Sequence, residues 1–167
     1  MKEEVNMQLL IDFVTNPCVV IPLSAWIIAQ IVKTIVNFCM TKELNFERLI
    51  GDGGMPSCHS AIVMALATTC GITYGFGSGI FAISFILATV VMHDATGVRR
   101  ETGKQAATLK RLAELVNSAI ADPDDHVRTE KLKELVGHSP LQVAMGGLLG
   151  TAIAVSAYFI FDLPSVY

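Results

Sequence analysis

Two long apolar runs dominate the pattern of hydrophobic and polar positions along the chain. Residues 17–39 contain a single charged side chain, Lys33, and residues 140–161 contain none. A helix needs about 20 mainly apolar residues to cross the hydrocarbon core of a bilayer. Both runs therefore predict helices that span a membrane.

Two further apolar runs, 58–75 and 79–95, meet at the short segment Gly-Phe-Gly-Ser that begins at position 75. Glycine and serine favour a tight connection, so this region predicts a hairpin of two spanning helices. Residues 5–14 are apolar at several positions but are too few and too polar to span. We expect an interfacial helix there.

The longest polar segment, residues 97–137, predicts a helical insertion between the third and fourth spans. Apolar side chains recur with a helical period in residues 104–120, and a second short helix is expected at 127–136. The sequence shows no repeat and no domain boundary. Residues 1–167 are therefore expected to form one all-α membrane domain, a polytopic bundle of four spanning helices with the interfacial helix and the insertion added.

Composition supports a membrane protein. Hydrophobic residues make up 52% of the chain and charged residues 16%, against about 25% charged residues in soluble domains. The net charge of −3 gives no support for nucleic-acid binding. The four cysteines form no C-x-x-C pair, and the His, Asp and Cys spacing offers no tetrahedral metal set. We expect buried thiols and no metal site.

The basic residues predict the orientation of the spans. Lysine and arginine are concentrated between the first and second spans and between the third and fourth, whereas residues 75–78 carry no charge. Cytoplasmic loops carry the Lys/Arg excess in membrane proteins. Both basic loops are therefore expected in the cytoplasm and both termini outside, in what we expect to be a bacterial plasma membrane.

This topology gathers polar residues at the cytoplasmic face: Arg48, His59, His93, Asp94, Arg99, Arg100, Lys104 and His138. Lys33 lies roughly two helical turns inside the same face. A charge within the membrane costs about 2.5–3.5 kcal/mol on insertion scales, so it is a candidate for function. The structural alternative is that Lys33 only extends to the lipid headgroups.

The segment GGMPSCHSA at residues 53–61 has the composition of an anion-binding helix start. Glycines permit unusual backbone angles, and a helix N-terminus presents unpaired N–H groups to phosphate. Two histidines make such a site reactive, since one can attack phosphorus while the other protonates the leaving oxygen. In the structural alternative, Ser57 only caps the helix and His59 only makes an interfacial hydrogen bond.

Three segments together resemble a known superfamily. They are GGMPSCHSA at 53–61, HDATGVRR at 93–100 followed by GKQA at 103–106, and GHSPLQV at 137–143 followed by GGLLG at 146–150. They resemble the divergent branch of the type 2 phosphatidic acid phosphatase and vanadium haloperoxidase superfamily, over residues 19–150. The resemblance implies an all-helical membrane lipid phosphatase that acts without a metal or other cofactor through a phosphohistidine intermediate.

The resemblance also implies roles for particular residues. Ser57 and the backbone at Cys58 would bind phosphate oxygens, His59 would be the general acid and His138 the nucleophile. The superfamily's Lys-x6-Arg-Pro motif does not occur in this chain. Arg48 is our first choice for the phosphate-binding basic residue that this motif supplies in the superfamily, followed by Lys33 and Lys42.

Gln142 is the largest departure, because the superfamily has a carboxylate at this position that orients the nucleophilic histidine. Asp94 is the best substitute and Glu134 the second. For Asp94, an ion pair with Arg99 or Arg100 is an equally good interpretation. Those two arginines and Lys104 would otherwise contact phosphate or anionic lipid headgroups.

The sequence therefore predicts a cytoplasm-facing phosphatase acting on a lipid phosphate or diphosphate, with membrane lipids as its surroundings. One alternative is a catalytically degenerate protein that binds a lipid phosphate. Another is a small transporter or flippase subunit that uses Lys33 and Asp94. Four spans are fewer than the six-helix core that the resemblance implies. The helices expected at residues 5–14 and 104–120, or the second subunit of a homodimer, would then complete the set of helices around the site.

Overall fold

A computed structural model describes residues 2–42, 54–120, 127–128 and 137–163. In these ranges the regular structure is helical and contains no strand, which confirms the all-α prediction. The helices are α1 (Lys2–Thr15), α2 (Pro17–Thr41), α4 (Cys58–Tyr74), α5 (Gly79–Thr96), α6 (Val98–Asn117) and α7 (Pro140–Phe161).

Three helical segments of the described chain are long and apolar enough to cross a membrane. They are Pro17–Thr41, Gly79–Asn117, which joins α5 to α6, and Pro140–Phe161. The second predicted span, α4, is an apolar helix of 17 residues and is shorter than these. The structure thus supports a membrane protein with three long candidate spans and one shorter apolar helix between them.

Side-chain caps explain where the bundle helices begin. Asn16 accepts a hydrogen bond from the Cys18 N–H at the start of α2, and Ser78 accepts one from the Phe81 N–H at the start of α5. Ser57 and Ser139 cap α4 and α7 in the same way. Such caps satisfy N–H groups that have no partner within the helix.

The short helix α4 lies at the centre of the bundle and packs against α2, α5 and α7. Alanines fill the contacts, and Ala25, Ala29, Ala61 and Ala65 are fully buried. Small residues allow helices in a membrane to approach closely. Large apolar side chains lie instead on the outside of α2, α5 and α7, where lipid would surround them.

Gly146 and Gly150 bring α7 closest to α4. A Cβ atom at Gly146 would collide with the carbonyl oxygen of Ser57, and one at Gly150 would collide with that of Ala61. The two glycines are four positions apart and therefore lie on one face of the helix. The start of α4, which carries the predicted phosphate-binding residues, is thus held directly on the α7 backbone.

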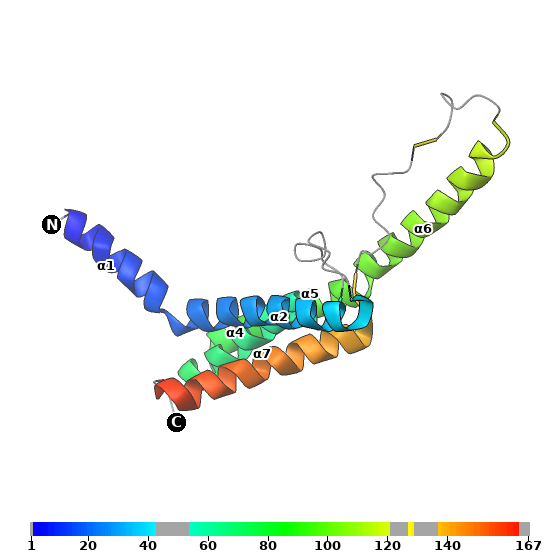
Figure 1. Cartoon of the computed structure of the whole chain (residues 1–167). Coiled ribbons are helices and arrows are strands. Elements are labelled where there is room, and N and C mark those ends of the chain that lie inside the picture. The colour runs from blue at the N-terminus through cyan, green and yellow to red at the C-terminus, as the bar shows by residue number, and fades with distance from the viewer. Residues whose placement is uncertain (1, 43–53, 121–126, 129–136, 164–167) are drawn as a thin grey trace.

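Helices α1 and α6 extend away from the bundle at opposite ends (Figure 1). The prediction that the first helix of the insertion begins at residue 104 was wrong, because α6 begins at Val98. Gly97 ends α5 by donating its N–H to the His93 carbonyl, and α6 continues at the next residue without a loop. The second predicted helix, 127–136, falls almost entirely outside the described residues.

Candidate active site

The segment of residues 54–57, here called the α4 entry loop, leads into the N-terminus of α4. Gly54 has a φ of +109°, a backbone conformation that residues with a Cβ atom rarely adopt. A Cβ at this position would also lie 3.1 Å from Cγ and Cδ of Lys33. Glycine therefore allows the loop to lie against the hydrocarbon stem of a lysine on α2.

The first turn of α4 leaves two backbone donors for a ligand. Ser57 donates its backbone N–H to the backbone carbonyl oxygen of Gln142 at 3.0 Å. The backbone N–H of Ser60 donates to the Ser57 hydroxyl oxygen at 3.3 Å. Among the described residues, the backbone N–H groups of Cys58 and His59 have no acceptor. These two donors, at the positive end of the helix dipole, suit an anion.

Ser57 is fully buried, and its hydroxyl is also arranged to donate a hydrogen bond. Its oxygen accepts from the hydroxyl of Ser60 at 3.0 Å as well as from the Ser60 backbone. The Ser57 hydroxyl hydrogen is therefore not used in either of these bonds. The sequence-predicted phosphate ligand Ser57 thus combines capping of α4 with one donor that can reach a bound oxygen.

His138 is brought to the start of α4 from the other end of the sequence. Its ring centroid lies 6.4 Å from that of His59, with the two ring planes at 81°. His138 is 3% exposed, whereas His59 is half-buried. The two predicted catalytic histidines are therefore neighbours, one buried and one half-buried.

The backbone fixes His138 between two helices. Its N–H donates to the Ala95 carbonyl near the end of α5 at 3.0 Å, and Gly137 before it has a φ of +92°. Ser139 after it caps α7. Asp94, the predicted substitute carboxylate, is half-buried and directly precedes the residue that accepts this bond.

Lys33 is the buried cation of this region. Only 4% of the residue is exposed, and its stem contacts the α4 entry loop at Gly54. A lysine that extends along the outside of a helix to the headgroups would be exposed. The burial of Lys33 therefore argues against that alternative and places its charge in the interior of the bundle.

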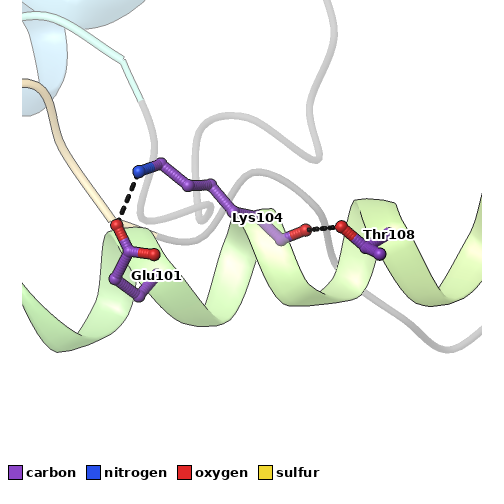
Figure 2. Close-up of polar contacts among 3 residues, drawn as sticks. All are labelled: Glu101, Lys104 and Thr108. Carbon is purple, nitrogen blue, oxygen red and sulfur yellow. Dashed lines mark hydrogen bonds and ion pairs between the residues drawn. The ribbon is translucent and has the colours of Figure 1, made fainter.

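The other predicted basic residues are placed differently. Lys42 is exposed and ends α2 in the left-handed conformation, and Arg48 lies outside the described residues. Arg99 and Arg100 fall in the first turn of α6, where their side chains are outside the described part. Lys104 pairs with Glu101 at 2.6 Å on the exposed surface of α6, next to Thr108 (Figure 2).

Gln142 has a structural use that the sequence analysis missed. Its side-chain oxygen accepts a hydrogen bond from the Ser139 N–H at 2.9 Å, and the Ser139 hydroxyl accepts from the Gln142 N–H at 3.3 Å. This reciprocal pair is a capping box, which the spacing Ser-x-x-Gln signals in sequence. Gln142, at the position predicted to orient His138, therefore caps the first turn of α7 with its side chain. Its backbone carbonyl accepts the hydrogen bond from the Ser57 N–H.

No group of three or more His, Cys, Asp or Glu side chains comes together within the described ranges. The groups gathered around the start of α4 are instead two histidines, a lysine and backbone or hydroxyl donors. This set can bind an oxyanion, supply a nitrogen nucleophile and move a proton.

Comparisons with known proteins place the sequence in a family. The sequence model of a family described as "Divergent PAP2 family" matches residues 14–153. The chain is also similar to a protein of Bacillus subtilis (strain 168) named "Uncharacterized membrane protein YuiD", with 39% identity over 155 residues, which is 89% of this chain and 98% of that protein. No solved structure matches.

Proposed function

The chain belongs to the Divergent PAP2 family, and on that basis we propose that it is a membrane phosphatase hydrolysing a lipid phosphate or diphosphate. The observation that carries the proposal is the pairing of His59 and His138, 6.4 Å apart, at a helix start with two unpaired N–H groups. A purely structural role does not need the second histidine.

Phosphate binding would use groups from two helices, α4 and α2. The N–H groups of Cys58 and His59 and the Ser57 hydroxyl would each donate to a phosphate oxygen. Lys33 would supply the positive charge from α2, taking the role that the sequence first gave to Arg48. Its burial strengthens the attraction, because charges interact more strongly where water is excluded.

The reaction would proceed in two displacements. A ring nitrogen of His138 attacks phosphorus and forms a P–N bond, while the bond to the lipid oxygen breaks and His59 protonates that oxygen. Water then attacks the phosphohistidine, His59 removes a proton from this water, and the P–N bond breaks to release phosphate. The half-buried His59 suits proton exchange, and the enclosed His138 suits a nucleophile shielded from solvent.

Asp94 would orient the imidazole of His138 in place of the superfamily's carboxylate. Support for this comes from the hydrogen bond of His138 to Ala95, the residue after Asp94, and from the use of Gln142 in the helix cap. An orienting carboxylate matters greatly, since its replacement by an amide costs about 10⁴ in rate in the serine-protease example.

The test is phosphate release by the purified full-length protein in detergent with a chelator present. The substrates are phosphatidic acid, phosphatidylglycerol phosphate and a prenyl diphosphate. We expect release by the parent, none by His138→Ala, and a loss of about 100-fold or more in His59→Ala. Asp94→Asn should also lose activity. His93→Ala, which changes an exposed histidine at the end of α5, is the matched control and should keep it.

Release that persists in His138→Ala would overturn the mechanism. Absence of release by a folded parent protein would favour the alternative of a degenerate site, to which Gln142 points. Equilibrium binding of the same lipid phosphates would then identify it, with Lys33→Met as the variant expected to lose binding.

A further inference from the structure

A pair of cysteines lies at the end of the bundle opposite His59 and His138. The sulfur atoms of Cys18, in the first turn of α2, and Cys70, near the end of α4, are 3.7 Å apart. Both are free thiols. Helix α4 begins at Cys58 beside the candidate site and ends at Tyr74, so Cys70 lies three turns from that site.

We propose that Cys18 and Cys70 form a reversible disulfide that links α2 to α4. The sulfurs must close to about 2.05 Å, a movement of less than 2 Å from their present separation. Two side chains on adjacent helices can make this movement by rotation about χ1. The pair is therefore close enough to bond without a rearrangement of the fold.

The packing between the two helices holds the pair in register. Ile21 and Ala25 continue the face of α2 on which Cys18 lies, and both pack in one cluster with Ala65 of α4. The same face of α2 continues to Lys33. Small residues at this contact let the backbones approach, which brings the cysteines at the end of the contact together.

The two thiols differ in access, which sets the order of the reaction. Cys18 is half-buried and Cys70 is 2% exposed. The Cys18 thiolate would attack a low-molecular-weight disulfide, forming a mixed disulfide and releasing one thiol. The Cys70 thiolate would then attack the Cys18 sulfur and release the second thiol. The two cysteine protons leave on the two released thiols, so two electrons pass to the oxidant.

The position of the pair suits oxidation. Residues 75–78, which connect α4 to α5 at this end, carry no charge. Apart from Lys2 near the N-terminus and Lys33 within α2, the lysines and arginines lie in the segments at the other end. The Lys/Arg bias therefore places Cys18 and Cys70 toward the outside, where disulfides form and persist. If the proposed function holds, the bond would fix the helix that carries Lys33 on the helix that begins beside Ser57.

The first experiment uses the purified full chain in detergent. The protein is treated with glutathione disulfide at mildly alkaline pH, which favours the reactive thiolate, then denatured and labelled with a maleimide. We expect two labelled cysteines, Cys39 and Cys58, and an intact mass lower by two hydrogens before labelling. Peptide mapping should join the segments that contain Cys18 and Cys70. Dithiothreitol should restore all four labels.

Variants make the assignment specific. Cys18→Ser and Cys70→Ser should each abolish the mass loss, while Cys39→Ser, which changes an exposed thiol at the far end of α2, should retain it. Four labelled cysteines after oxidation, a stable glutathione adduct on Cys18, or a disulfide between other cysteines would each overturn the proposal. These readouts need no phosphatase activity, so failure of the proposed function would be distinguished from failure here.

Discussion

At the scale of single residues, Lys33 is the buried charged side chain beside the candidate site. It is charged, 4% exposed and in contact with the α4 entry loop. Burial excludes water from the ammonium group and so strengthens its attraction to any negative charge that binds beside it. A phosphate held at the start of α4 would be such a charge.

Lys33→Met tests this role while keeping the length of the side chain. A charge-assisted hydrogen bond contributes about 1.5–3 kcal/mol, so we expect phosphate release or lipid phosphate binding to fall about 10- to 100-fold. The helix should fold normally because methionine suits a membrane interior. Lys42→Met, at an exposed position, is the control and should retain activity. Equal activity of the two variants would show that Lys33 does not bind substrate.

Gln142 allows a second test at this scale, because its cap and an orienting role predict different results. Gln142→Glu can keep the capping box, whereas Gln142→Ala removes it and should cost about 1 kcal/mol of stability. We expect the melting temperature to fall only in the alanine variant and the rate to stay level in the glutamate variant. A large gain in rate for Gln142→Glu would instead indicate a missing orienting carboxylate at this position.

At the scale of helices, the contact between α4 and α7 decides the shape of the site. It rests on the close approach of Gly146 to the Ser57 carbonyl, with the Ser57 N–H bound to Gln142 one turn earlier on α7. The residues that would hold phosphate are thus positioned by a backbone contact. Any side chain larger than hydrogen at Gly146 must move the start of α4.

Gly146→Ala should therefore impair both stability and function. Overpacking of a tight contact costs about 1–3 kcal/mol, and displacement of Ser57 should remove most phosphate release. Gly147→Ala is the matched control, since a Cβ there would meet only the flexible side chains of Met64 at 3.3 Å and Met92 at 3.7 Å. Thermal unfolding and activity of both variants would be compared. Similar results for the two glycines would contradict this assignment.

At the scale of the whole molecule, the bundle has two chemically different ends. One end carries the α4 entry loop, His138 and the exposed Cys39 in the last turns of α2. The other carries the uncharged connection between α4 and α5 and the pair of Cys18 and Cys70. The distribution of lysine and arginine predicts that the first end faces the cytoplasm.

Membrane-impermeant maleimide labelling of vesicles tests this orientation. We expect Cys39 to react in inside-out vesicles and to be protected in right-side-out ones. The matched variant is Gly77→Cys in a Cys39→Ser background, because Gly77 lies at the opposite end and a Cβ there meets no atom within 4 Å. Its labelling should show the reverse pattern. Reversed results for both positions would place the candidate site outside.

Local sequence features were sufficient to predict most helices of the bundle. Asn16, Ser57, Ser78 and Ser139 each precede an apolar run and cap a helix in the structure. The reason is that every backbone polar group in lipid must be satisfied within its helix, so apolar length and caps mark the bounds. The convergence of segments 53–61, 93–100 and 137–143 on one face also followed from the order of the predicted spans.

Only the tertiary structure decided how the site is assembled. It buried Lys33 beside Gly54, brought the rings of His59 and His138 to 6.4 Å and bound the Ser57 N–H to the backbone carbonyl of Gln142. These relations depend on the rotation and depth of each helix. Helix rotation and depth are fixed by contacts between small residues far apart in sequence, such as Gly146 with Ser57, and the period of apolar residues does not encode them.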